Sequence, residues 1–324
     1  MAEKTFIVTP TWNNEDYTIR CFDSIRKNTS DYRIVWIDNG SEPEAREKVR
    51  IFLEENDIPH EKILNDENLG FVKATNQGME RAMEMGAEYI VFENNDTEVY
   101  EGWLERMIEV AESDPKIGLV GPVTSPCDSW QSIRNIKDKI SEFSDLPGYD
   151  NNPEEYAKII KEKYKGKKKE VSPMVAFFST LVKAEVAKDI GFLSEEYGIG
   201  FNDDDDYCTR ARNAGWKIAV AMDVFVFHNH RTTFKLRFDD EKIEEMKKEN
   251  LTKFGNKFAD DKDYDFEKLL RKGKMKYFKN KKAGNFEFWK KGILGEAVRM
   301  LKSEGLIKFT KNFLKFLSRK IWGK

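Results

Sequence analysis

The strongest constraint on the fold is a regular alternation in the first 122 residues of the chain. Short runs rich in β-forming residues alternate with segments of about three turns whose apolar residues follow helical spacing. This pattern is typical of βαβ units on a mostly parallel sheet flanked by helices, an α/β fold. The 324 residues, 40% of them hydrophobic, allow one large domain with an appendage, or two domains. The expected strands are 5–9, 33–37, 63–64, 89–92 and 117–122, and the expected helices are 15–27, 44–55, 72–85 and 102–113.

The first strand is not followed by a phosphate-binding glycine loop. Pro10-Thr11-Trp12-Asn13 stands there instead, and no GxxxxGK[ST] motif occurs in the chain. Dinucleotide-binding and P-loop chemistry are therefore disfavoured. Asp38 ends the second strand, where a nucleoside-binding acid would lie. Asp38-Asn39-Gly40 is equally good as a plain turn, so both interpretations stand at this position.

The fourth strand runs into a polar cluster. Tyr89-Ile90-Val91-Phe92 stops at Glu93-Asn94-Asn95-Asp96, as in a buried strand that delivers a carboxylate to the carboxyl edge of a sheet. Ligands bind at that edge in open α/β sheets. For this stretch alone a turn role is the more common outcome. An acid cluster and a histidine further along the chain favour function.

The acid cluster is Asp203-Asp204-Asp205-Asp206. A helix over 204–214, ended by Gly215 as C-cap, would carry it in the first turn. Acids suit a helix N-terminus, but four in a row repel one another unless a cation or a reaction uses them. We therefore favour a functional cluster over simple capping.

Three further strands are expected around this helix. They cover 174–179, 217–222 and 224–227, and the last ends at His228-Asn229-His230. His228 suits a metal or phosphate ligand, although a structural histidine is the more common case, and His230 is left unassigned. The polar segment 127–169 is expected to be an inserted loop with a short helix at 153–163, placed where an acceptor could approach. A surface loop without a role is the alternative.

The C-terminal region differs in charge from the rest of the chain. Residues 268–324 hold 18 Lys or Arg against 3 Glu, a net charge of +15, and residues 1–267 carry −18. Residues 306–324 contain an amphipathic helix with a basic face, which suits an anionic membrane surface. Packing on the protein's own core, or a homodimer seam, explains the same stripe equally well. The stripe is Leu306, Phe309, Phe313, Phe316, Leu317 and Ile321.

Other features bound the cellular setting. The three cysteines show no CxxC spacing, and neither a signal peptide nor a membrane-spanning run is evident. We expect a cytoplasmic protein, with peripheral attachment to the cytoplasmic face of the membrane if 306–324 binds lipid. No recognisable nucleic-acid-binding motif accompanies the basic tail, so nucleic acid is not an expected partner.

From about residue 6 to residue 234, the ordered motifs resemble a family 2 glycosyltransferase with the GT-A fold. Asn94 replaces the first Asp of that family's DxD motif, and Asn-Asn-Asp-Thr is similar to rhamnosyl- and galactofuranosyltransferase-like members. The resemblance implies a GT-A domain at 1–238, with a nucleotide-binding half at 1–122 and an acceptor half at 123–238, and a basic helical region at 239–324. The motifs are Pro10–Asn13, Asp38–Ser41, Asn68–Phe71 with Asn76 and Gly78, Asn94–Thr97, Gly102–Leu104, Gly121-Pro122, Asp203–Arg210, Gly215 and His228.

The resemblance also implies an activity. The chain would move a hexosyl or rhamnosyl group, with inversion, from a UDP- or dTDP-sugar to a glycan or polyprenyl-linked glycan, using Mn²⁺ or Mg²⁺. Asp96 and His228 would bind the metal, and Asp204, with Asp203 second, would act as the base. Asp206 and Arg210 would hold the cluster in shape. The alternatives are a nucleotide-sugar-binding protein with a decayed site and a sugar-phosphate nucleotidyltransferase. Donor-binding positions would be Thr9, Pro10, Asn13, Asp38, Asn68, Gly70, Asn76, Asn94 and Asn95.

Overall fold

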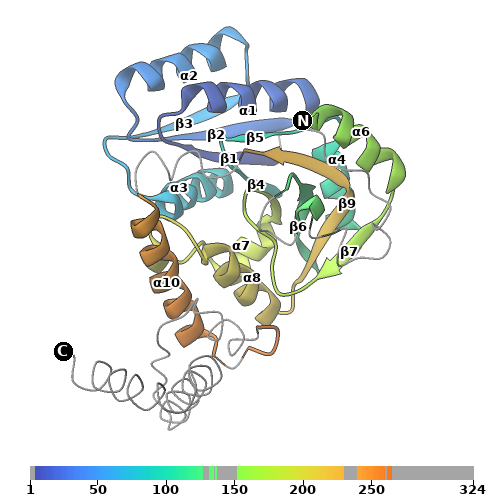
Figure 1. Ribbon diagram of the computed structural model, residues 1–324. Helices are drawn as coiled ribbons and strands as arrows, with labels where there is room; N and C mark the ends of the chain where they lie inside the picture. Colours follow the sequence, from blue (N-terminus) through green and yellow to red (C-terminus); the bar gives the residue numbers. More distant parts are fainter. Residues whose placement is uncertain are drawn as a thin grey trace, which may run out of the picture. The chain divides into compact units, whose positions relative to one another are not determined.

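The computed structural model describes residues 4–126, 131–134, 136, 152–229, 239–259 and 261–264. The chain divides into two compact units, Met1–Asn250 and Leu251–Lys324. The candidate site residues all lie in the first unit, which Figure 1 shows as a sheet with helices packed on it.

The first unit is built on a nine-stranded, mostly parallel sheet. Its order is β3-β2-β1-β4-β8-β6-β9-β5, and β7 pairs with β9 beside this path. Strands β3, β2, β1 and β4 run parallel to one another, and β6 runs parallel to β9. Strand β8 is antiparallel to both β4 and β6, and β5 and β7 are antiparallel to β9. The strands are β1 (Thr5–Thr11), β2 (Tyr32–Asn39), β3 (His60–Asn65), β4 (Tyr89–Glu93), β5 (Thr97–Glu98), β6 (Ile117–Thr124), β7 (Lys168–Val171), β8 (Ser179–Lys183) and β9 (Lys217–His228).

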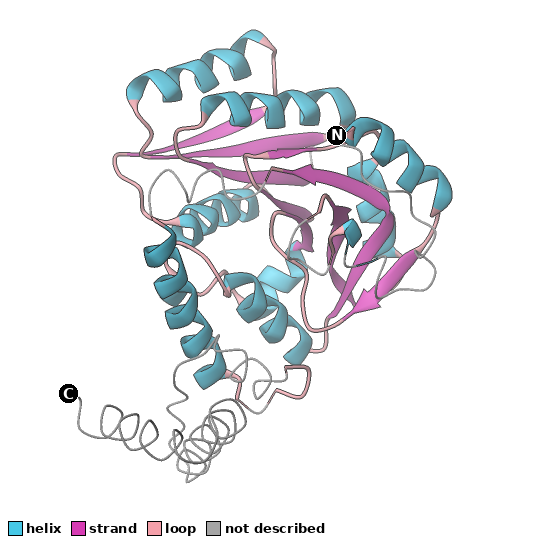
Figure 2. Cartoon of the chain, in the orientation of Figure 1, coloured by secondary structure: helices cyan, strands magenta, loops and turns pink. Residues whose placement is uncertain are grey.

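Helices cover both faces of the sheet (Figure 2). Ile7 belongs to the core that the buried sides of α1, α2 and α4 complete. Val8, the next residue, faces the opposite side, since a Cβ added to Gly78 of α3 would meet its side chain at 2.4 Å. Glycine at position 78 thus lets α3 lie close against β1. The helices are α1 (Glu15–Asn28), α2 (Pro43–Glu55), α3 (Phe71–Glu84), α4 (Trp103–Glu112), α6 (Pro153–Lys163), α7 (Ala184–Ile190), α8 (Asp203–Asn213) and α10 (Asp240–Lys257).

The α/β, mostly parallel sheet predicted from the alternating pattern is confirmed. The strand predicted at 174–179 is wrong, because β8 begins at Ser179. The apolar residues before it form a buried loop: the Phe177 ring packs 5.0 Å from Phe92, and the Phe178 carbonyl accepts from the Asn94 amide at 2.8 Å.

The break predicted between 217–222 and 224–227 is also wrong, since β9 is one strand through Asp223. Both carboxylate oxygens of Asp223 accept from Nε of Arg106, at 2.8 and 2.9 Å, and this pairing lets the acid stay buried within a strand. The register between β9 and β6 shifts at this point, as in a β-bulge. Strands β5 and β7, which contain two and four residues, were not predicted.

The carboxyl ends of β1, β2, β3, β4, β6 and β9 share one edge of the sheet, since these strands run in the same direction. Because β8 runs the opposite way, the loop that precedes it reaches the same edge. Each element that carries a candidate residue has one end at this edge of the sheet.

In the second unit, the described residues form a small aromatic cluster. The Phe254 ring lies 5.1 Å from Phe258 and 4.8 Å from Tyr264. Several predicted features lie outside the described residues, namely His230, the domain boundary at 238 and the basic helix at 306–324. Among the described residues, no helix combines the length and hydrophobicity that crossing a bilayer requires.

Candidate active site at the carboxyl edge of the sheet

Asp96 and His228 meet at the end of β4. Oδ1 of Asp96 lies 3.1 Å from Nε2 of His228, and both side chains are largely buried. The side-chain amide nitrogen of Asn94, Nδ2, lies 3.4 Å from the same ring nitrogen. The ring of Phe178 stacks on the His228 imidazole with 5.2 Å between centroids. A carboxylate, an imidazole and an amide are therefore gathered at one point.

Backbone contacts fix this pair. Thr97 of β5 pairs with His228 of β9, and the Asn229 amide donates to the Asp96 carbonyl at 2.9 Å. The Ser125 hydroxyl donates to the His228 carbonyl at 2.9 Å. Strand β5 thus returns the chain from β4 onto β9 directly after Asp96. Asn95 does not join this group, because its amide donates to the Thr18 hydroxyl of α1 at 3.0 Å.

Glu93, the last residue of β4, directly precedes Asn94 and is 1% exposed. Burial raises its pKa to about 8. The geometry agrees: Oγ1 of Thr97 lies 2.5 Å from Oε1 of Glu93 and 2.7 Å from the Asn94 carbonyl, and one hydroxyl hydrogen cannot serve two acceptors. A protonated Glu93 that donates through Oε1 to Thr97 leaves the Thr97 hydrogen for the Asn94 carbonyl. We infer that Glu93 is a neutral acid that holds the loop in shape.

The donor set at Asp96 suits a divalent cation that completes its coordination with substrate oxygens. Two ligands at about 2.1 Å in neighbouring octahedral positions are about 3 Å apart, close to the observed Asp96–His228 separation of 3.1 Å. Among the described residues there is no group of three or more His, Cys, Asp or Glu that could hold a metal ion. A cation here would have few protein ligands, which is common for magnesium bound through substrate phosphates.

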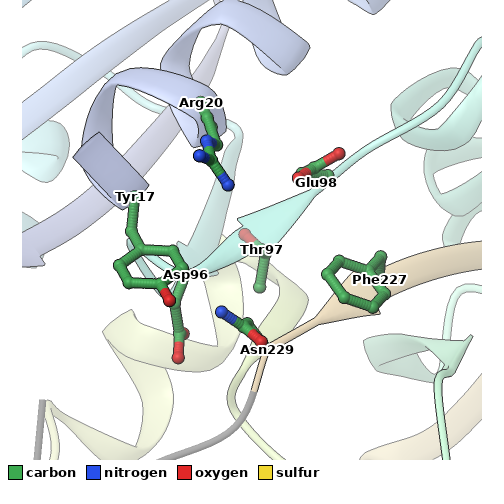
Figure 3. A pocket seen from close by; sticks show the side chains of 7 residues that line it. All are labelled: Tyr17, Arg20, Asp96, Thr97, Glu98, Phe227 and Asn229. Carbon is green, nitrogen blue, oxygen red and sulfur yellow. The ribbon is translucent and has the colours of Figure 1, made fainter. Parts of the chain in front are cut away.

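A pocket opens beside Asp96 on the α1 side, with a volume of about 190 Å³. Figure 3 shows Tyr17 next to Asp96, and Arg20 one turn further along the helix. The Arg20 guanidinium lies 5.9 Å from the Tyr17 ring centroid. The pocket thus places aromatic, cationic and anionic groups around the Asp96 carboxylate. Its lining residues are Tyr17, Arg20, Asp96, Thr97, Glu98, Phe227 and Asn229.

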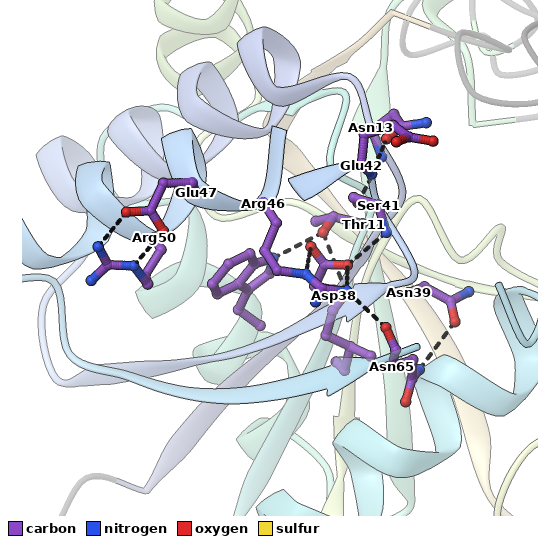
Figure 4. Close-up of polar contacts among 12 residues, drawn as sticks. Thr11, Asn13, Asp38, Asn39, Ser41, Glu42, Arg46, Glu47, Arg50 and Asn65 are labelled. Atoms are coloured by element: carbon purple, nitrogen blue, oxygen red, sulfur yellow. Dashed lines mark hydrogen bonds and ion pairs between the residues drawn. The ribbon is translucent and has the colours of Figure 1, made fainter. Parts of the chain in front are cut away.

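Asp38 at the end of β2 is fully buried and paired (Figure 4). Nε of Arg46 on α2 lies 3.1 Å from Oδ2 of Asp38, and Oδ1 accepts from the Ser41 amide at 2.8 Å. Nη2 of Arg46 also donates to the Asn65 carbonyl at 2.8 Å. Asp38 and Arg46 therefore fix the turn that follows β2 and tie it to the end of β3.

The loop after β1 is fastened to that turn. The Asn13 amide donates to the Ser41 hydroxyl at 2.8 Å, and Oδ1 of Asn13 accepts from the Glu42 amide at 2.9 Å. Asn13 and Asn14 both have left-handed backbone conformations, which asparagine tolerates better than most residues. Thr9 and Pro10 lie within β1 itself, and the hydroxyl of Thr9 is buried without a hydrogen-bond partner.

An amide network supports the third loop. Oδ1 of Asn39 accepts from the Leu69 amide at 3.0 Å, and its Nδ2 donates to Oδ1 of Asn68 at 3.2 Å. The Gly70 amide donates to Oδ1 of Asn68 at 3.0 Å. Asn76 is engaged elsewhere, because its Nδ2 donates to the Leu193 carbonyl and its Oδ1 accepts from the Leu193 amide, both at 2.9 Å. The structure thus brings Asn68 and Gly70 to the edge and uses Asn76 to tie α3 to the loop after α7.

The acid cluster forms the first turn of α8. Burial raises the pKa of Asp203 to about 7, and burial followed by the charge of Asp205 raises that of Asp204 well above its usual value. Asp205 accepts from the Asn202 amide at 2.7 Å. The predicted pair of Asp206 with Arg210 is confirmed at 2.7 Å.

Aromatic contacts place α8 beside the end of β4. The ring of Tyr207 packs 6.2 Å from Phe92 and 5.8 Å from Phe177. Arg210 extends the anchorage by donating to the Ile190 and Phe192 carbonyls at 2.7 and 2.8 Å. Helix α8, which carries the acids, therefore packs against β4, the strand that leads to Asp96. The contact residue Phe92 lies two residues before Asn94.

Comparison with known proteins decides the family. The model of Glycosyl transferase family 2 matches residues 6–191, more than half of the 324 residues. The chain belongs to this family. A search of curated proteins finds no match.

Solved structures share the fold of this family 2 glycosyltransferase at low identity. The mannosyltransferase PcManGT from Pyrobaculum calidifontis, in complex with GDP-Man and Mn²⁺, is 15% identical with a TM-score of 0.59, over 99% of this chain and 81% of that one. TarS from S. aureus in complex with UDP-GlcNAc is 13% identical with a TM-score of 0.51, over 76% and 65%. GalNAc-T7 with UDP, GalNAc and Mn²⁺ is 15% identical with a TM-score of 0.54, over 84% and 55%.

Two supporting residues of this glycosyltransferase were missed from the sequence, Arg46 of α2 and Asn250 of α10. Asn39 was part of the motif Asp38–Ser41, but its bond to the loop at Leu69 was not predicted. An arginine on the first helical turn after an acidic strand end was the one local signal for Arg46. Nothing near Asn250 in the sequence marks it.

Proposed function

We propose that the chain is a metal-dependent, inverting glycosyltransferase that takes its sugar from a nucleoside diphosphate donor and delivers it to a glycan acceptor. The observation that carries the proposal is the pairing of Asp96 with His228 at the sheet edge, where the ring of Tyr207 also packs α8 against Phe92 of β4. Family membership supports the reaction class. Fold neighbours solved with GDP-Man, UDP-GlcNAc and Mn²⁺ support a nucleotide-sugar donor.

On the donor side, the loops after β1, β2 and β3 would form the nucleoside site. Thr9 and Pro10 come from the end of β1 and Asp38 from the end of β2. Asn13 comes from the first loop, and Asn68 and Gly70 come from the third. The Asp38 carboxylate is fully buried against Arg46 and the Ser41 amide. A uracil or thymine N3–H would therefore reach Asp38 only after the turn at 39–41 moves. Asn76 would act indirectly, by holding the loop at Leu193.

The diphosphate would lie next to Asp96, with Asn94 and Asn95 on the loop that carries it. Asp96 and His228 would hold a Mn²⁺ or Mg²⁺ ion together with phosphate oxygens. Such an ion supplies charge stabilisation for a leaving nucleoside diphosphate. Because Asn94 stands where a second acid would be, the protein ligands of the cation carry little negative charge. We therefore propose that the affinity for the cation depends on bound nucleotide.

On the acceptor side, Asp204 would remove the proton from the attacking hydroxyl, with Asp203 as the second candidate. Burial raises the pKa of Asp204 well above its usual value and that of Asp203 to about 7, and a raised pKa gives a carboxylate more proton affinity as a base. Arg210 and Asp206 would keep the first turn of α8 in place.

We also propose the finer assignments that the sequence suggested. The transferred group would be hexosyl or rhamnosyl from a UDP- or dTDP-sugar, within a domain at 1–238. The acceptor would be a glycan or polyprenyl-linked glycan.

The basic segment 306–324 would attach a cytoplasmic protein to an anionic membrane surface. Flotation with liposomes containing 30% anionic lipid, by wild type and a chain ending at residue 305, tests the attachment. Equal recovery of both proteins with the liposomes rules it out.

The decisive experiment is a donor panel. Binding and hydrolysis of UDP-glucose, UDP-galactose, UDP-N-acetylglucosamine, UDP-galactofuranose, dTDP-rhamnose and GDP-mannose would be measured with and without Mn²⁺ or Mg²⁺. Wild type and Asp96→Ala would be compared. One donor that binds with metal and is lost in the variant supports the proposal and names the sugar. Failure of every donor contradicts it.

A further inference from the structure

Asn250 of α10 binds three carbonyl groups of one loop. Its Nδ2 lies 3.0 Å from the Tyr197 carbonyl oxygen, 2.7 Å from that of Gly200 and 3.2 Å from that of Phe201. The side chain is 5% exposed. A single buried amide group therefore gathers the carbonyl groups of the loop that enters α8.

The backbone of this loop needs such support. Gly198, Gly200, Phe201 and Asn202 all have positive φ angles, at 57°, 122°, 70° and 64°. Phe201 and Asn202 are not glycines, and a side chain in this region is disfavoured by contact with the backbone. Asp203 follows directly. The left-handed turn therefore sets the direction in which the first turn of α8, with both candidate bases, leaves the loop.

The same loop touches the donor side. The Val72 amide at the start of α3 donates to the Gly198 carbonyl at 3.2 Å. A Cβ added to Gly70 would meet the Gly198 carbonyl oxygen at 3.0 Å, so the two backbones are in close contact. The loop held by Asn250 thus runs from the predicted donor-binding position Gly70 to the acids of α8.

We propose that Asn250 is a positioning residue for the transfer reaction. By holding the loop 197–201 in its left-handed form, it aims the Asp203 and Asp204 carboxylates at the acceptor. The inference rests on the proposed function for its catalytic part. It also extends the working part of the chain beyond His228, to α10.

The test compares Asn250→Asp and Asn250→Ala with wild type in the full-length protein. Aspartate keeps the shape of the side chain but turns three favourable contacts into repulsions, and alanine removes them. Asn213→Asp is the matched control, because it makes the same charge change at an exposed position of α8. Donor KM, kcat, melting temperature and hydrogen exchange of amides 198–205 would be measured, using the donor found in the panel.

We expect Asn250→Asp to lower kcat by about 100-fold, the effect of misplacing a catalytic group by about 1 Å, with donor KM changed less than about threefold. Exchange should rise at amides 198–205 and stay unchanged in β1–β4. Unchanged kcat and exchange overturn the proposal. So does a general rise in exchange with a matching fall in melting temperature, which indicates a merely structural role.

The two proposals fail separately. If wild type binds no donor, the proposed function is wrong, and hydrogen exchange alone decides whether Asn250 holds the loop. If wild type transfers sugar and Asn250→Asp does so at the same rate, only the positioning role is lost.

Discussion

Asp96 and His228 lie 3.1 Å apart, although β4 and β9 are separated by β8 and β6 in the sheet. The two-residue strand β5 closes this gap, since it follows Asp96 directly and pairs with the end of β9. Asp96 reaches His228 through this short return of the chain.

The first prediction concerns cation binding. Asp96→Asn and His228→Gln should each weaken Mn²⁺ binding in the presence of a nucleoside diphosphate by about tenfold or more, because each removes one of the few protein ligands. Electron paramagnetic resonance of free Mn²⁺, titrated with UDP, GDP and dTDP in turn, measures the effect without turnover. Asn213→Ala is the control, because Asn213 lies at an exposed position of α8. Equal Mn²⁺ affinity in wild type and both variants would show that Asp96 and His228 do not bind the metal.

The second prediction is an acidic limb in the pH profile. The base must be ionised, and burial raises the pKa of both Asp204 and Asp203 above the usual value, so activity should fall on the acidic side. If Asp203 is the controlling group, with its pKa raised to about 7, the transfer rate at pH 6 should be roughly one tenth of its plateau. Rates from pH 5.5 to 8.5 would be compared for wild type, Asp203→Asn and Asp204→Asn.

The variant that lacks the base should lose about 10²- to 10⁴-fold in kcat. We expect Asp204→Asn to show the larger loss. A wild-type profile that is flat between pH 5.5 and 8 would exclude both acids as the base.

The third prediction concerns Glu93 and stability. Its pKa is raised from 4.5 to about 8 by burial, so the folded state holds a proton that the unfolded state releases. The contribution of Glu93 to stability is greatest below pH 4.5 and is lost as pH rises toward 8. The free energy of unfolding of Glu93→Gln, relative to wild type, should therefore rise with pH by up to about 1.4 kcal/mol per unit between pH 5 and 8. Urea unfolding at several pH values measures this slope, and a difference that does not change with pH would show that Glu93 is ionised in the folded protein.

The fourth prediction tests the pair of Arg46 with Asp38. Arg46→Met leaves a buried carboxylate without its cation and should cost about 1–3 kcal/mol, less than for a fully buried pair because Arg46 is partly exposed. Arg50→Met on the same helix is the matched control. Its ion pairs with Glu47 and Glu54 lie at the surface, and its loss should cost under about 1 kcal/mol.

A double variant completes this test. Asp38→Asn in the Arg46→Met background should recover part of the loss, because it removes the unpaired charge. Chemical denaturation of wild type, Arg46→Met, Arg50→Met and the double variant measures these free energies of unfolding. Equal effects of Arg46→Met and Arg50→Met would mean that the buried pair adds nothing.

The sequence predicted the features that depend on local pattern. The alternating strands and helices, the helix at 153–163 and the Asp206–Arg210 pair were all found, because each follows from spacing along the chain. Features set by contacts between distant segments were not. The apolar run before Ser179 looked like a strand because its burial comes from Tyr207 and His228 rather than from a ladder. The resemblance placed Asn76 at the donor site, and its bond to Leu193, which lies far along the chain, was not predicted.

The sheet order also bears on how the chain folds as it is made. Strands β1 to β4 pair among themselves, so this half of the sheet can form once residue 93 has left the ribosome. Strand β8 then adds to β4, and β9 must be made before His228 can meet Asp96. The Asp96–His228 pair can therefore form only after residue 228 has been made, well after the strands that carry Asp96 into the sheet.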